Sequence, residues 1–175
     1  MPVWNGSAWV YQGIKNAQVD AAAAIAYSKL NLAASIVNAD LAPTYANYTP
    51  TWTGTSTNPA IGNGSITGRY MQIGKFIHAW VKIVAGSTTT FGTGNYVISL
   101  PVAQSASIPV NFQMGVATTL DSSAGAVYQL LPLIGAGALV LAVPASPLSQ
   151  FAGSAVPFAY ATSDALYVNV TYEAA

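Results

Sequence analysis

After residue 47, apolar and polar side chains alternate along short runs, which clusters of Gly and Pro separate every 10 to 15 residues. The runs 76–85 and 165–173 alternate most strictly, and this period of two predicts half-buried β-strands. The side chains expected to face the core are Ile77, Ala79, Val81 and Ile83 in the first run and Leu166, Val168, Val170 and Tyr172 in the second.

Seven further runs between turn residues are rich in Val, Thr, Tyr and Trp, a composition that indicates strands. They are residues 49–55, 65–73, 96–100, 112–119, 127–131, 138–143 and 156–162. Nine strands in about 128 residues are typical of an antiparallel β-sandwich with jelly-roll-like or Greek-key connections. We therefore predict a mainly β chain with a β-sandwich domain over residues 48–175, and the strand order stays open.

Residues 14–41 carry a different pattern, an internal repeat of 11 residues. Its apolar positions are Ile14, Ile25 and Ile36, and Val19, Leu30 and Leu41. Eleven residues make three helical turns of about 3.67 residues each. The segment is rich in Ala and has no Pro or Gly before Pro43, so we predict a short helical segment within an N-terminal domain of residues 1–47.

The repeat cannot form a single apolar stripe, because the two apolar positions of each copy lie about 130° apart around a helix. Two arrangements stay open: one helix with a wide contact face, or short helical turns that break at Asn31 and Ser35, both common N-cap residues. In either arrangement we expect the six aliphatic residues to mediate oligomerisation with identical copies of the chain. The alternative is a helix that packs on its own domain.

The chain carries very little charge: five Lys plus Arg, five Asp plus Glu, and 6% charged residues in all, against about 25% in an average domain. Five scattered cations provide no basic surface for a phosphate backbone, so we expect no nucleic-acid partner. The absence of Cys excludes thiol nucleophiles, Cys-ligated zinc and disulfides. Such a neutral surface favours burial in an oligomer or a larger assembly.

Residues 126–143 are the best membrane candidate, with 18 residues and no charge. Pro132, Gly135 and Gly137 interrupt the stretch and no Lys or Arg flanks it, whereas a spanning helix needs about 20 apolar residues with anchored ends. We predict two buried strands joined by a turn at 134–137, and no membrane insertion. The N-terminus has no basic segment followed by an apolar core, so we expect no secretory signal.

Acid–base chemistry by paired carboxylates has few candidates. Asp20 and Asp40 belong to the repeat, while Asp121 and Asp164 stand in turn sequences, where an Asp commonly accepts hydrogen bonds from its own backbone. No Ser occupies a recognisable nucleophile elbow. We therefore expect no enzyme activity and no cofactor.

His78 is the only imidazole, so a multi-histidine metal site would require several copies of the chain around an axis. Its place between Phe76 and Trp80 on a strand face favours a role in cross-strand packing. The chain also has ten Tyr, four Trp and five Phe. Such side chains can stack on sugar rings, or they can fill the core and subunit interfaces. We expect Trp4 and Trp9 to be interface anchors.

Several stretches resemble proteins of tailed bacteriophages. Residues 24–41, AIAYSKLNLAASIVNADL, look like the stalk repeat of tail-fibre and related appendage proteins. A β-domain of minor tail and other virion proteins is similar to the runs YTPTWTG (48–54), NPAIGNG (58–64), GRYMQIG (68–74) and YVISLPV (96–102). The opening WNGSAW (4–9) is also similar to the openings of such proteins.

The resemblance implies a homotrimeric structural protein on the virion exterior, without cofactor or enzyme activity. The repeat would form the threefold stalk, the β-domain a knob, and Trp4 and Trp9 would anchor the chain to capsid or tail proteins. Three repeat copies are few for a long adsorption fibre, which favours a compact decoration or head-fibre trimer. Head and tail locations both stay open: a capsid decoration or head-fibre protein, or a minor tail or fibre protein. The alternative function is a receptor-binding module of a tail fibre that recognises a host-surface glycan.

Overall fold

The computed structural model of the chain describes residues 2–11, 45–135, 137–144 and 150–175. The chain divides into two units, Met1–Ala42 and Pro43–Ala175. In the described part of the first unit, β1 (Pro2–Trp4) and β2 (Trp9–Tyr11) form an antiparallel hairpin. The helical segment predicted within residues 14–41 lies outside the described residues.

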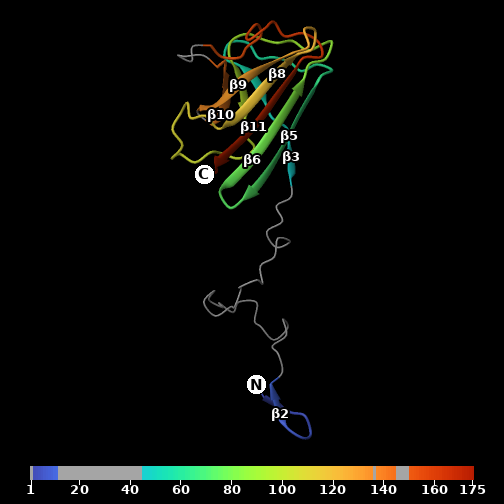
Figure 1. The fold of residues 1–175 in the computed structure, drawn as a ribbon, viewed down its shortest axis with the longest axis vertical. Helices are drawn as coiled ribbons and strands as arrows, with labels where there is room; N and C mark the ends of the chain where they lie inside the picture. The colour runs from blue at the N-terminus through green and yellow to red at the C-terminus, as the bar shows by residue number, and fades with distance from the viewer. Residues whose placement is uncertain (1, 12–44, 136, 145–149) are drawn as a thin grey trace. The chain divides into compact units, whose positions relative to one another are not determined.

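The second unit is one antiparallel sheet of nine strands (Figure 1). The strands are β3 (Ala46–Tyr48), β4 (Trp52–Gly54), β5 (Ser65–Ile73), β6 (Phe76–Val84), β7 (Tyr96–Ser99), β8 (Gly115–Asp121), β9 (Ala126–Gly135), β10 (Ala138–Ala142) and β11 (Ala165–Glu173). Their spatial order is β3-β5-β6-β11-β8-β9-β10-β7-β4. The mainly β, antiparallel class predicted from the sequence is confirmed.

The sheet is curled, so that its two edges lie close together. The edge strands β3 and β4 follow each other directly in the chain. Four Cα steps of about 3.8 Å connect Tyr48 to Trp52, so these two residues lie within about 15 Å of each other. The long strand β9 belongs to both halves of the sheet, since its first part pairs with β8 and its second part with β10. Buried side chains from both halves form one core cluster.

Several strand predictions agree with the structure to within one residue. The runs 65–73 and 165–173 are strands β5 and β11 with the predicted bounds, and β6 ends one residue before the predicted limit. All eight side chains expected to face the core from β6 and β11 are buried. The charge-free stretch 126–143 contains the predicted strand pair β9–β10.

One predicted strand is absent, and three others have shifted bounds. The described structure has no strand over residues 156–162, where Pro157 lacks the N–H that a ladder needs and the Tyr160 N–H donates locally to the Ser154 carbonyl. The shifted strands are β4, which covers 52–54 rather than 49–55, β8, which covers 115–121 rather than 112–119, and β9, which covers 126–135 rather than 127–131. Strand β3 was not predicted, because its three residues are too few to show an alternation.

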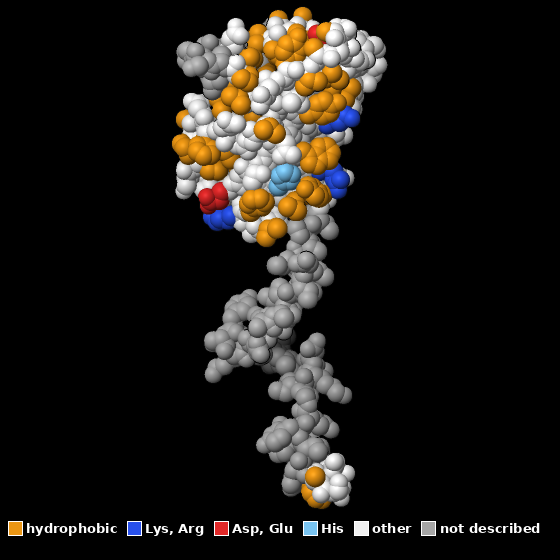
Figure 2. All heavy atoms as spheres, in the orientation of Figure 1, with side chains coloured by type: hydrophobic (Ala, Val, Ile, Leu, Met, Phe, Trp, Pro, Cys, Tyr) orange, Lys and Arg blue, Asp and Glu red, His pale blue; other side chains and the backbone are white. Residues whose placement is uncertain are grey.

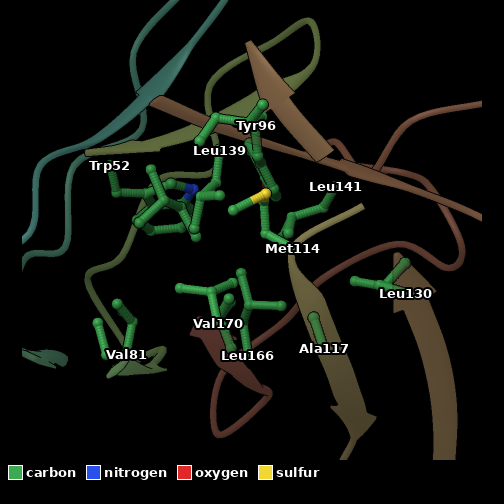
Figure 3. Close-up of a cluster of buried hydrophobic side chains, with 14 of the residues drawn as sticks. Trp52, Val81, Tyr96, Met114, Ala117, Leu130, Leu139, Leu141, Leu166 and Val170 are labelled. Atoms are coloured by element: carbon green, nitrogen blue, oxygen red, sulfur yellow. The ribbon is translucent and has the colours of Figure 1, made fainter. Parts of the chain in front are cut away.

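Aromatic rings fill the core where β4 meets β7. The ring of Trp52 lies 5.0 Å from that of Tyr96, and the ring of Tyr160 lies 5.7 Å from Tyr96 on another side. Tyr96 is fully buried, and its hydroxyl donates to the Phe91 carbonyl at 3.0 Å. Figure 3 shows Trp52, Tyr96 and Leu139 grouped on one side of the cluster and Val81, Leu166 and Val170 below them.

The buried tyrosines make the fold sensitive to alkaline pH. Burial is the main cause that raises the pKa of Tyr160 and that of Tyr172 to about 12, against about 10 in an unfolded chain. The native state therefore keeps these two protons at a pH where the unfolded state loses them. Their contribution to the free energy of unfolding is fully present below about pH 10 and falls as the pH rises towards about 12.

We accordingly expect the urea midpoint to decrease between about pH 10 and pH 12, as measured by tryptophan fluorescence. Burial also raises the pKa of Tyr48 and of Tyr96, which add to the same decrease. Tyr172→Phe removes one of these four titrations and should make the decrease less steep. A midpoint that stays constant over this interval would contradict the prediction.

Candidate functional site

The outward side chains of β6, β11 and β8 line a shallow groove of about 420 Å³. We call it the outer-face groove, and its side chains are Trp80, Lys82, Val116, Thr118, Tyr167 and Asn169. Val81, Ala117 and Val168 also line the groove, but their side chains are buried in the core, so the backbone forms its floor. Figure 2 shows this side of the unit, with hydrophobic side chains spread over it and cations along the β5–β6 side.

Strand register places the groove side chains in two rows across the sheet. Trp80, Asn169 and Val116 are direct neighbours in one row, and Lys82, Tyr167 and Thr118 in the next. Adjacent strands lie about 4.8 Å apart, and alternate residues along a strand about 6.8 Å apart. The two rows therefore form a patch on the order of 10 by 7 Å between Cα positions, which is large enough for one sugar ring.

Two cations contact the aromatic rings of this face. The guanidinium carbon of Arg69, on the neighbouring strand β5, lies 5.2 Å from the ring centroid of Tyr45 and 6.0 Å from that of Trp80. Lys82 Nζ lies 6.0 Å from the ring centroid of Tyr167. These distances are within the range of cation–π attraction, which orients both cations over the face.

Two of the described carboxylates, Asp121 and Asp164, accept hydrogen bonds within turns. Asp164 is buried and accepts hydrogen bonds from the N–H of Ala161 at 2.6 Å and of Ser122 at 2.8 Å. Asp121 accepts from the N–H of Ala124 at 3.0 Å and from the Ser123 hydroxyl at 2.7 Å, and these bonds lower the pKa of its carboxyl. The turn role predicted for Asp121 and Asp164 is confirmed. Asp20 and Asp40 lie outside the described residues.

His78 has the cross-strand packing role that the sequence predicts. It lies opposite Thr171 of β11, with Nδ1 3.3 Å from the Thr171 hydroxyl, and its ring meets the ring of Tyr45 edge-on at 6.2 Å. Within the described part of the chain, no three His, Asp or Glu residues are grouped closely enough to hold a metal ion.

All the predicted oligomerisation residues lie outside the residues that the structure describes. They are Ile14, Val19, Ile25, Leu30, Ile36 and Leu41. Trp4 is 53% exposed and stands opposite Trp9 in the register of the β1–β2 hairpin. Their anchoring role stays a prediction. Across the described ranges, no helix is long and apolar enough to cross a membrane.

Sequence reasoning missed the groove, although it placed Trp80 and Tyr167 on the outward face of their strands. Tyr167 is 39% exposed and Val116 55% exposed. The sequence did contain a signal: in each of these two strands, an aromatic residue stands on the outward face, where the alternation predicts mostly polar residues. Other exposed apolar side chains stand at turns and strand ends: Ile73, Phe76, Val110, Phe112 and Val127.

Comparisons of the chain with protein-family models, with curated proteins and with solved structures found no match.

Proposed function

We propose that the chain is a structural protein on the exterior of a tailed-bacteriophage particle, a homotrimeric appendage that attaches through its N-terminal segment. Its partners would be two further copies of itself and proteins of the capsid or tail. A capsid decoration or head fibre is the first location to test, and a minor tail or fibre protein the second. The resemblance of residues 24–41 and of the runs within 48–102 supports the viral assignment.

The observation that carries the proposal is the surface of the β unit. Residues 43–175 contain only six charged side chains, one of which, Asp164, is buried. The same surface exposes large apolar side chains such as Phe76, Phe112 and Val127. Because charge keeps free domains soluble, a surface with so little charge suits a protein that works inside an assembly.

We also propose that the curled sheet is a β-sandwich of the Greek-key kind, with jelly-roll-like connections as the alternative. The order β11-β8-β9-β10 supports this classification. Three strands follow one another through short connections, and the fourth returns over residues 143–164 to pair with the first. This order matches the Greek-key pattern, which most β-sandwiches contain.

The proposal predicts a specific mass and a specific location. Light scattering on the purified chain should give three times the chain mass of 18.0 kDa. Antibodies against residues 43–175 should label intact particles in electron micrographs at regularly spaced exterior sites. A stable 18.0 kDa species at micromolar concentration would contradict the trimer. The absence of the chain from purified particles would contradict the virion role.

A further inference from the structure

The outer-face groove is built like a ligand site, and the structural role proposed above makes no use of it. We propose that it binds a sugar that carries a carboxylate on its ring, as in a uronic-acid polysaccharide. This inference gives the glycan-recognition alternative a site and a ligand class. It stands independently of where the chain sits on a particle.

The aromatic side chains of the groove provide the surface for a sugar ring. Trp80 and Tyr167 stand on adjacent strands as diagonal neighbours, since Trp80 pairs with Asn169 and Tyr167 with Lys82. The apolar C–H face of a pyranose packs against such rings, as other apolar faces do. The floor between them is backbone, which leaves room for a flat ligand, and a volume of about 420 Å³ is within the range of small-molecule sites.

Polar side chains stand beside these rings without partners of their own. Within the described residues, no hydrogen bond engages the Asn169 amide or the Thr118 hydroxyl, which project into the two rows of the groove. An amide offers two donors and an acceptor, and a hydroxyl offers a donor and acceptors. Together they match the alternating donor and acceptor character of adjacent sugar hydroxyls.

The charge of the groove favours an anionic sugar over a neutral one. Lys82 Nζ lies 6.0 Å from the Tyr167 ring, so a sugar stacked on that ring brings its own carboxylate near the ammonium. Arg69 contacts the Trp80 ring, and its N–H edge can pair with a carboxylate in a bidentate manner. Among the described carboxylates, none forms part of the groove lining.

Two other occupants fit less well. A polyol joined by phosphodiesters carries its charge in the linkage and has no ring to stack on Tyr167. A second copy that used the same face in a twofold contact would bring Lys82 and Arg69 towards their own counterparts, and like charges in an interface oppose association. A threefold contact would pair this face with a different surface of the next copy, and the native mass of the groove variants tests that case.

The test uses the full chain and titration calorimetry with oligogalacturonate, compared with its methyl ester, which has the same rings with the carboxylates capped. We expect oligogalacturonate to bind, the ester to bind at least about tenfold more weakly, and added salt to weaken the binding. Lys82→Met and Tyr167→Ala should each reduce affinity about tenfold or more. Lys75→Met, which removes an exposed Lys from the β5–β6 turn outside the groove, should leave affinity unchanged.

Near-UV circular dichroism establishes that each variant keeps the native fold, so that lost binding is assigned to the groove. Equal binding of the acid and its ester, or no binding of either at millimolar concentration, would overturn the proposal. Binding of polyglycerol phosphate without oligogalacturonate would replace it with a phosphate site. A change of native mass in Lys82→Met or Tyr167→Ala would identify the face as a contact between copies, and would overturn it as well.

Discussion

Replacing Tyr96 by Ala is expected to destabilise the β unit by about 3–5 kcal/mol, a large fraction of the stability of an ordinary domain. Tyr96 is fully buried in β7, where its ring lies 5.0 Å from Trp52 and 5.7 Å from Tyr160. The substitution leaves a cavity between the two halves of the curled sheet, because the surrounding side chains relax only partly into the space that a buried ring leaves. Urea unfolding followed by tryptophan fluorescence measures the loss.

Two matched variants separate the causes. Tyr96→Phe removes only the hydroxyl that donates to the Phe91 carbonyl at 3.0 Å, which should cost about 1 kcal/mol. Tyr167→Ala makes the same large-to-small change on the outer face, where it should cost less than about 1 kcal/mol. If Tyr96→Ala and Tyr167→Ala lowered stability equally, the placement of the core between the two halves would be wrong.

The strands that the sequence predicts well are those whose burial differs between their two faces. In β6 and β11, one face packs in the core and the other meets solvent. Apolar and polar residues therefore alternate along the sequence of each strand. β3 could not be found in this way, because its three residues are held by pairing with β5, about 20 residues away in the chain. Its existence depends on a partner and not on a local pattern.

The strand order and the groove could not be predicted from the sequence for the same reason: both depend on pairing between distant segments. β3 and β4 are consecutive in the chain and stand at opposite edges of the sheet, which no local signal predicts. The groove requires Trp80, Asn169 and Val116 to share one row, and this register is fixed by contacts between three segments far apart in the sequence. The sequence predicts which side chains face outward, but their neighbours emerge only from the assembled sheet.

The assembly prediction concerns Ile25 and Leu30, one from each apolar position of the second repeat copy. We expect the double substitution Ile25→Asp plus Leu30→Asp to abolish the trimer and to give a monomeric or an insoluble product. If both positions face sister chains, six carboxylates enter one apolar interface, and each buried unpaired charge costs several kcal/mol. Light scattering reads the mass, and near-UV circular dichroism reads whether the aromatic core of the β unit stays native.

The matched control adds the same charge at polar positions of the repeat segment that lie outside both apolar rows and the face between them, as Asn16→Asp plus Ser28→Asp. Because these side chains are not part of the apolar rows, the control should remain trimeric. A double variant at Ile25 and Leu30 that still has the mass of a trimer would show that the 11-residue spacing does not mediate assembly. If both variants became monomeric, added charge anywhere in the segment would be enough to disrupt the trimer, and the assignment of the contact to the two apolar rows would be wrong.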